Sequence, residues 1–189
     1  TTFTRALTGD LSRRLAVLVG GGPEQITVRS LHACARRIYE EDLGKRFVEL
    51  DRALLSRLID EGLAANPRVS FPAGFVRSEW DAVIDPYGVR SRAAYFNAPR
   101  RGRGQGLGKL QKAGLWKVFA HVLAGIEAAG QCSFRGMCAA AAGWLEAHPD
   151  QRPFDHLIAD EAQDLSHTEL RFLRALVAPG PDDLFLVGD

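Results

Sequence analysis

Residues 154–164 read Phe-Asp-His-Leu-Ile-Ala-Asp-Glu-Ala-Gln-Asp. The apolar run in the middle of this stretch predicts a short strand buried on both faces, which ends in two adjacent carboxylates, Asp160 and Glu161. Buried parallel strands commonly carry a site at their carboxyl ends. One of two such acids can hold a hydrated Mg²⁺, while its neighbour orients or deprotonates an attacking water. The alternative is that the pair only begins a surface loop.

The chain continues from this strand into a predicted helix and a second strand. Residues 166–169, Ser-His-Thr-Glu, have the capping-box pattern, and leucines recur at helical spacing behind them. Residues 184–187 predict another strand, which leads into Asp189. A strand, a helix and a strand within about 30 residues form a βαβ unit, in which the two strands run parallel. We therefore expect Asp189 to lie near Asp160.

The pentapeptide Asp-Glu-Ala-Gln-Asp at 160–164 resembles motif II of the UvrD/Rep family of superfamily 1 helicases, in which it is the Walker B sequence of a P-loop NTPase. The tetrapeptide Leu-Val-Gly-Asp that ends at Asp189 resembles the start of motif III. The resemblance implies ATP and Mg²⁺ as cofactors. It implies that Asp160 holds the ion through water, that Glu161 activates the attacking water, and that Gln163 and Asp189 lie beside the nucleotide.

Two further segments resemble motifs of the same family. Thr-Phe-Thr-Arg, which contains Phe3 and Thr4, resembles motif Ia, T-F-T-N, with Arg5 in place of the commoner asparagine. Val-Arg-Ser-Leu-His-Ala, which contains Ser30 and His32, resembles motif Ib. The resemblance implies that these four residues contact single-stranded DNA. The alternatives are that Phe3 packs in the core and that His32 is structural.

The net charge of +1 conceals a basic segment. Between Asp85 and Glu127 there is no acidic residue and there are eight basic ones. These are Arg90, Arg92, Arg100, Arg101, Arg103, Lys109, Lys112 and Lys117. Aromatic residues are interspersed with them, a mixture that can bind phosphates and stack bases, although solvated helix faces would read the same way. Arg92, Arg101 and Arg103 are the best candidates for contacts to a DNA backbone.

The predicted organisation is α/β. It is part of a RecA-like P-loop NTPase domain with parallel strands, interrupted by an all-α insertion subdomain. Residues 1–47 would be the first part of RecA-like domain 1A, with a strand at 26–28. Residues 48–149, whose apolar spacing is almost wholly helical, would be subdomain 1B. Residues 150–189 would be the second part of domain 1A.

The composition indicates a cytoplasmic protein without a membrane partner. Of its 189 residues 46% are hydrophobic, enough for a substantial core, yet no apolar run reaches membrane-spanning length. The three cysteines lack paired spacing, so neither a disulfide framework nor a zinc site is indicated.

Two functions remain open from the sequence. In the first, the chain is an internal piece of an ATP-dependent 3′ to 5′ DNA helicase or translocase acting on single-stranded or partly duplex DNA. No Walker A sequence occurs in it, so the Walker A segment and the second RecA-like domain would belong to the rest of the parent chain. We expect the piece alone to be inactive. In the second, it is a single-stranded nucleic-acid-binding or interaction module with a degenerate nucleotide fold.

Overall fold

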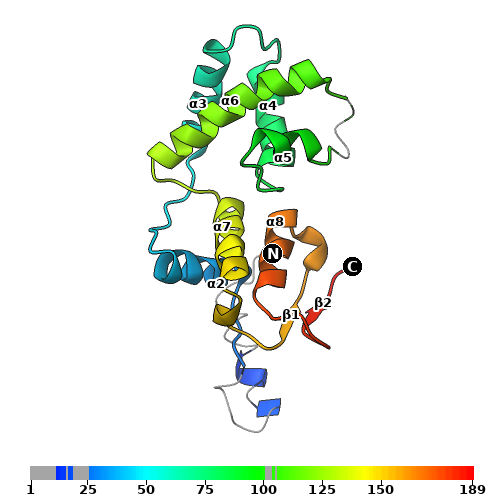
Figure 1. The fold of residues 1–189 in the computed structure, drawn as a ribbon. Coiled ribbons are helices and arrows are strands. Elements are labelled where there is room, and N and C mark those ends of the chain that lie inside the picture. Colours follow the sequence, from blue (N-terminus) through cyan, green and yellow to red (C-terminus); the bar gives the residue numbers. More distant parts are fainter. Residues whose placement is uncertain (1–11, 16, 19–25, 101–103, 105) are drawn as a thin grey trace.

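The computed structural model describes residues 12–15, 17–18, 26–100, 104 and 106–189, and these form two lobes that meet at a narrow junction (Figure 1). The helical lobe consists of α3 (Arg52–Ala64), α4 (Ala73–Glu79), the π-helical turn Trp80–Ile84, α5 (Arg92–Asn97) and α6 (Lys109–Ala128). The strand-bearing lobe consists of α2 (Leu31–Arg37), the π-helical turn Ile38–Asp42, α7 (Phe134–Ala147), the 3₁₀ turns Pro149–Gln151 and Ala162–Asp164, β1 (Leu157–Ala159), α8 (His167–Ala175) and β2 (Leu184–Leu186).

The core of the helical lobe forms where α3 crosses α6. On α6, Leu115, Phe119 and Val122 recur at helical spacing and are fully buried. The helices approach closely because Gly125 has no side chain: a Cβ there would lie 2.3 Å from a methyl carbon of Leu58 on α3. This lobe therefore has an apolar core of its own.

The strand-bearing lobe has a second core, built mainly by α2, α7 and α8. Met137 and Leu145 of α7 pack there with Phe172 and Leu176 from the α8 region, and all four are buried. Helix α7 thus packs with α2, which precedes the predicted insertion 48–149, and with α8, which follows it. In sequence, α7 itself lies within that predicted insertion. None of the helices in the described ranges combines the length and apolarity needed to cross a bilayer.

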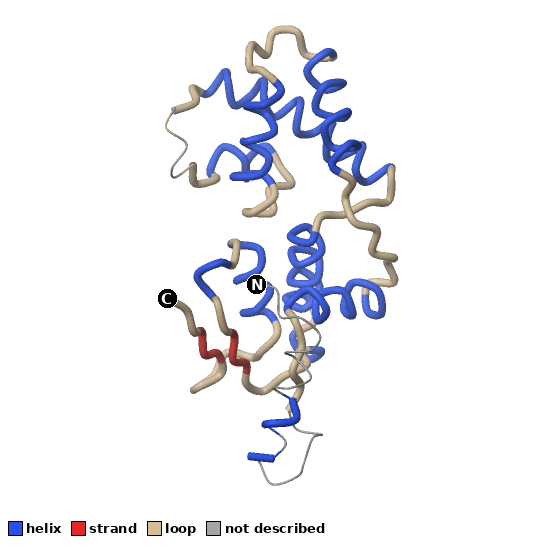
Figure 2. Tube along the Cα trace, turned by 180° about the vertical axis from the view of Figure 1, so that it is seen from behind, coloured by secondary structure: helices blue, strands red, loops and turns tan. Residues whose placement is uncertain are grey.

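The two strands pair in parallel, as the βαβ pattern predicts. Their register pairs Leu157 with Leu184, Ile158 with Phe185 and Ala159 with Leu186. They lie on the outer side of the lobe, next to α8 (Figure 2). The prediction that the first strand is buried on both faces is wrong, because Ile158 is 77% exposed; its partner in the second strand, Phe185, is 63% exposed. Alternate residues face opposite ways, so Leu157 and Ala159 pack against the core while Ile158 points away from it.

The predicted fold class is also wrong. The described part of the chain is mostly helical, at 59%, and it has one sheet of two three-residue strands, which is not an α/β RecA-like domain with parallel strands. Residues 26–28 form no strand and pair with no described strand, and Ile26 is 38% exposed. The two cores are formed chiefly by helices, so no layer of strands separates them.

The chain crosses between the lobes in two extended segments that pair with each other. Leu50 N–H donates to the carbonyl of Cys132 at 3.0 Å, and Cys132 N–H donates to the carbonyl of Val48 at 2.8 Å. A third contact comes from the loop after the π-helical turn of the helical lobe, where Thr168 N–H donates to the carbonyl of Pro86 at 3.0 Å. The junction therefore consists of a paired crossing and one docked loop.

Candidate functional site

The acidic pair lies immediately after β1, at a strained point of the backbone. Asp160 is exposed, and its Oδ1 accepts the Glu161 N–H at 2.9 Å. Glu161 has φ of 56°, in the left-handed region that residues other than glycine seldom occupy. Such strain costs on the order of 1–3 kcal/mol and is concentrated at functional sites. It marks the end of β1 as a candidate site independently of the motif.

The end of β2 lies directly against the segment that follows the acidic pair. Ala162 N–H donates to the carbonyl of Val187 at 2.8 Å, and Gln163 Nε2 donates to Glu161 Oε2 at 2.7 Å. Gly188 lies against this segment: a Cβ there would meet the side-chain oxygen of Gln163, and it would lie 3.2 Å from the backbone nitrogen of Gln163. The expected meeting of the two strand ends is confirmed. Asp189, the next residue, is exposed.

The carboxylates at these strand ends suit one kind of cation. Among the described residues, no three His, Cys, Asp or Glu side chains stand close enough to hold a metal ion by themselves. Mg²⁺ dehydrates reluctantly and is usually held by one or two carboxylates and its remaining waters. The exposed Asp160 fits that requirement. A cation that needs an all-protein cage would not fit here.

The residues predicted to face DNA divide between described and undescribed parts of the chain. Phe3, Thr4, Arg101 and Arg103 lie outside the described residues. Ser30 caps α2, its Oγ accepting the N–H of residue 33 at 3.3 Å. That hydroxyl thus already has a structural role at the start of the helix.

His32 lies in the first turn of α2, between partners from two other helices. Its Nε2 is 3.1 Å from Glu169 Oε1 on α8, and its ring stacks on Phe134 of α7 with centroids 4.7 Å apart. The histidine side chain is 42% exposed, so a ligand can still reach it. His32 is therefore both held by the protein and accessible.

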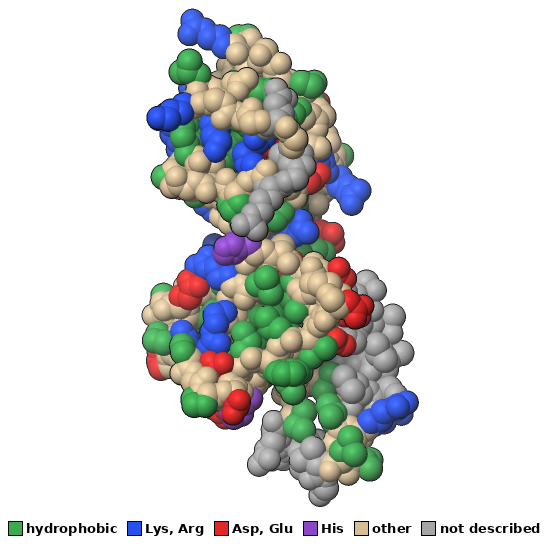
Figure 3. Space-filling view, turned by 90° about the vertical axis from the view of Figure 1, so that its right-hand side faces the viewer, with side chains coloured by type: hydrophobic (Ala, Val, Ile, Leu, Met, Phe, Trp, Pro, Cys, Tyr) green, Lys and Arg blue, Asp and Glu red, His purple; other side chains and the backbone are tan. Residues whose placement is uncertain are grey.

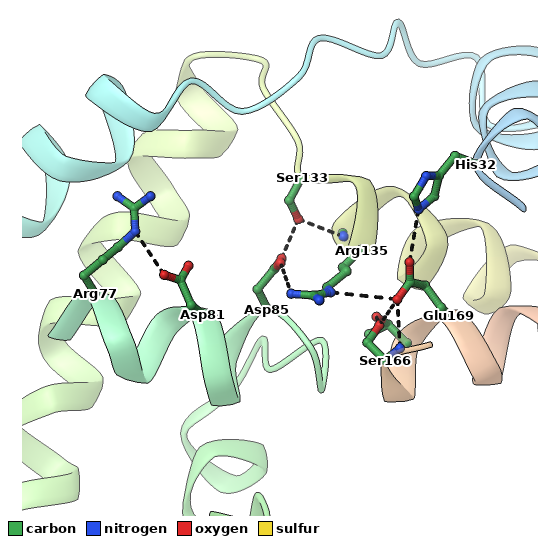
Figure 4. A network of polar contacts seen from close by, with 10 residues as sticks. His32, Arg77, Asp81, Asp85, Ser133, Arg135, Ser166 and Glu169 are labelled. Atoms are coloured by element: carbon green, nitrogen blue, oxygen red, sulfur yellow. Dashed lines mark hydrogen bonds and ion pairs between the residues drawn. The ribbon is translucent and has the colours of Figure 1, made fainter. Parts of the chain in front are cut away.

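Glu169 belongs to a polar network that crosses the junction (Figure 4). Arg135 of α7 reaches Glu169 at 3.8 Å and Asp85 of the helical lobe at 3.6 Å. Asp85 also accepts a hydrogen bond from Ser133 Oγ at 2.5 Å. Burial raises the pKa of Asp85, although the bond from Ser133 and the charge of Arg135 oppose that shift. A chain of charges thus joins α2, α8 and α7 to the helical lobe.

The network borders a cavity of about 320 Å³ between the lobes. The cavity is lined by cationic groups, including Arg52, Arg77 and Arg135, and by acids and rings. Part of its charge is already paired, since Arg77 contacts Asp81 at 3.4 Å. No local sequence pattern predicts this cavity, because its walls come from segments far apart in the chain.

The basic segment supplies fewer accessible charges than its sequence indicates. Arg100 forms a two-pronged ion pair with the fully buried Glu79, at 2.7 and 2.9 Å, and Lys112 Nζ donates to the carbonyl of Phe96 at 2.8 Å. Arg92 is exposed and lies over the Phe96 ring, 5.2 Å from its centroid. On the face in Figure 3, the charged side chains of the helical lobe are mostly Lys and Arg, and the acidic side chains lie mostly on the other lobe.

Sequence reasoning found the acidic pair and His32 but missed their neighbours. In the sequence, Glu169 appears only as the last residue of a capping box. No motif in the sequence distinguishes Arg135 or Asp85 as functional residues. No protein-family model and no curated protein matches this chain. The interpretation of the site therefore rests on its own geometry and on the motif resemblance.

Proposed function

We propose that the chain is part of a cytoplasmic, ATP-dependent DNA helicase or translocase of 3′ to 5′ polarity. Its partner would be single-stranded or partly duplex DNA, and the rest of the parent chain would supply the nucleotide-binding loop and a second motor domain. One observation carries the proposal: two parallel strand ends bring a strained acidic pair and Gln163 against Gly188. The 3′ to 5′ polarity comes from the motif resemblance alone.

Each residue of this site has a distinct role in the proposal. When bound, ATP would supply the phosphoryl group that water attacks, and Mg²⁺ would neutralise the charge that develops on its oxygens. Asp160 holds the hydrated ion, and Glu161 accepts a proton from the attacking water. Gln163 is hydrogen-bonded to Glu161, and both Gln163 and Asp189 would contact the nucleotide. In this proposal, Gln163 and Asp164 also relay the state of the bound nucleotide toward His32.

The proposal rests on the site and not on the fold class. Function depends on the placement of particular groups, and the same placement occurs on different architectures. Two short strands are sufficient to bring the acids and the glycine together. The mainly helical character of the chain therefore does not bear on the chemistry of the strand ends.

The test is a Glu161→Gln change in the complete protein. Glutamine keeps the shape and can still accept a bond from Gln163, but it is a poor proton acceptor. We expect Mg²⁺-dependent ATP binding to persist and turnover to fall by about two decades or more. Glu146→Gln, which removes an exposed carboxylate on α7, is the control and should leave turnover unchanged. Equal turnover in the wild type and the Glu161 variant would remove the catalytic assignment.

A second candidate function is a single-stranded nucleic-acid-binding module that does not respond to nucleotide. It is favoured by the exposed Arg92, whose guanidinium lies over the ring of Phe96 in the basic segment. The two candidate functions are distinguished by the affinity of the complete protein for labelled single-stranded DNA. This affinity is measured over a range of salt concentrations, with and without Mg²⁺-ATP. A steep salt dependence that is indifferent to nucleotide would select the module.

A further inference from the structure

Glu169 is a buried charge whose two oxygens serve two different parts of the molecule. The residue is 8% exposed, and Oε2 accepts the Ser166 N–H at 2.9 Å and the Ser166 hydroxyl at 2.5 Å. These local bonds complete the capping box of α8. Oε1 is directed elsewhere, to His32 at 3.1 Å, across 137 positions of sequence. A capping residue alone would not need that second contact.

The carboxylate is held in its charged form. Burial by itself raises the pKa of Glu169, but the hydrogen bonds from His32 and Ser166, together with the charge of Arg135, outweigh burial and lower it to about 2. A carboxylate accepts hydrogen bonds and donates none, so the proton of this contact is on Nε2 of His32. Glu169 therefore fixes one edge of the imidazole, and the stack on Phe134 fixes its face.

The same glutamate ties His32 to the acidic pair through a short piece of chain. Glu161 is followed by the 3₁₀ turn Ala162–Asp164, and the cap residue Ser166 comes two positions later. Glu169 in turn accepts hydrogen bonds from the N–H and the hydroxyl of Ser166. A short stretch of chain and these hydrogen bonds thus connect the imidazole to the candidate catalytic segment.

We propose that Glu169 is a positioning residue, which holds His32 at the edge of the cavity between the lobes in the orientation that contacts single-stranded DNA. The inference rests on the proposed function for the DNA-facing role of His32. Glu169 itself touches no ligand and acts through His32. This makes a prediction about sign, because removal of a negative charge beside a polyanion would otherwise strengthen binding.

The test uses Glu169→Gln in the complete chain, because glutamine can also occupy the third position of a capping box and so keeps α8 capped. Glu146→Gln is the matched control: it breaks an exposed ion pair with Arg171 between α7 and α8, away from His32. Two quantities are measured. These are the imidazole ¹⁵N and ¹H resonances of His32, assigned by loss of signal in His32→Gln, and the affinity for a fluorescent oligo-dT strand at fixed salt.

We expect Glu169→Gln to shift the His32 resonances and to weaken oligo-dT binding about three- to tenfold, the range of one net hydrogen bond. In a His32→Gln background, the same change should cause no loss of affinity, because the contact that Glu169 orients is already absent. Glu146→Gln should alter neither readout. Unshifted His32 resonances, unchanged or tighter binding by Glu169→Gln, or an equal loss in the His32→Gln background would each overturn the inference. A wild-type chain that binds no oligo-dT would instead refute the DNA role in the proposed function, and the resonances would still decide whether Glu169 orients the ring.

Discussion

The buried pair of Glu79 and Arg100 allows a quantitative test of what stabilises the helical lobe. Glu79 is fully buried, its carboxylate accepts two bonds from Arg100 and one from the hydroxyl of Tyr95, and the Arg100 side chain is only 10% exposed. Glu79→Ala removes the counter-charge and leaves the guanidinium with little access to water. Breaking a buried pair from one side costs about 3–5 kcal/mol.

The chain contains a matched exposed pair. Glu146 and Arg171 also form a two-pronged contact, but both side chains are 43% exposed. Water screens such a pair, so Glu146→Ala should cost less than about 1 kcal/mol. The two substitutions remove the same chemical group, and they differ mainly in burial.

Urea unfolding followed by tryptophan fluorescence separates the lobes. Trp80 and Trp116 report on the helical lobe, and Trp144 reports on the other. In a Trp144→Phe background, Glu79→Ala should lower the unfolding midpoint by roughly 1.5–2.5 M urea, if the slope is about 2 kcal/mol/M. A Glu79→Ala shift below about 0.5 M, the size expected of an exposed pair at that slope, would refute the reasoning, because burial would then make no difference.

Three further predictions concern single residues. Gly125→Ala should destabilise the chain by up to about 2 kcal/mol in urea unfolding, because the overlap with Leu58 costs about 1–3 kcal/mol and helix propensity returns about 1 kcal/mol. Gly143→Ala on α7, where the nearest atom is 4.0 Å away, should stabilise the chain by about 1 kcal/mol, and the opposite order of the two variants would contradict both predictions. The pKa of Glu169 is lowered from 4.5 to about 2, so the stability that its charged form contributes is fully present above pH 4.5. About 3 kcal/mol of that stability is lost as the pH falls toward 2. Unfolding midpoints compared at pH 7 and pH 3 should show a much smaller loss in Glu169→Gln than in the wild type. Glu161→Gly should stabilise the chain by about 0.5–1 kcal/mol, because relief of the left-handed strain is worth about 1–2 kcal/mol and exceeds the cost of the extra chain entropy of glycine. A melting temperature lower than that of the wild type would argue against strain at Glu161.

Local features of the structure followed directly from local sequence. Ser30 caps α2, and Ser166 with Glu169 forms the predicted capping box at the start of α8. Each depends on hydrogen bonds within three positions of chain, which the sequence specifies by itself. The parallel pairing of β1 and β2 was also predictable, because a crossover of this length through one helix permits little else.

The fold class was not predictable in the same way, because it depends on which surfaces are covered. An apolar run such as Leu157–Ala159 reads alike whether one or both of its faces are buried, and only the 77% exposure of Ile158 distinguishes the cases. The β-branched residues at 26–28 favour a strand, but they belong to no described strand, because a strand also needs a partner. β1 and β2 are joined by one short crossover, which makes their pairing predictable, whereas a partner for 26–28 would have to come from a distant part of the chain that the local pattern does not specify.

The candidate site divides along the same line. The acidic pair was visible because its residues are adjacent, and the position of Gly188 beside Gln163 followed from the strand pairing. The contact between His32 and Glu169 joins residues 137 positions apart, and no spacing rule reaches across that distance. Its members come from α2 and α8, which meet only because both pack against α7.

The strand end and the network are parts of one continuous segment. Residues 160–169 include the strained Glu161 at one end and the buried Glu169 at the other, with the cap residue Ser166 between them. The strand end is fixed by the backbone bonds of β2, and Glu169 is fixed by His32 and Arg135. Both ends of the segment are therefore held by hydrogen bonds. Residues 160–169 thus form a continuous connection along the chain between the acids and the junction of the lobes.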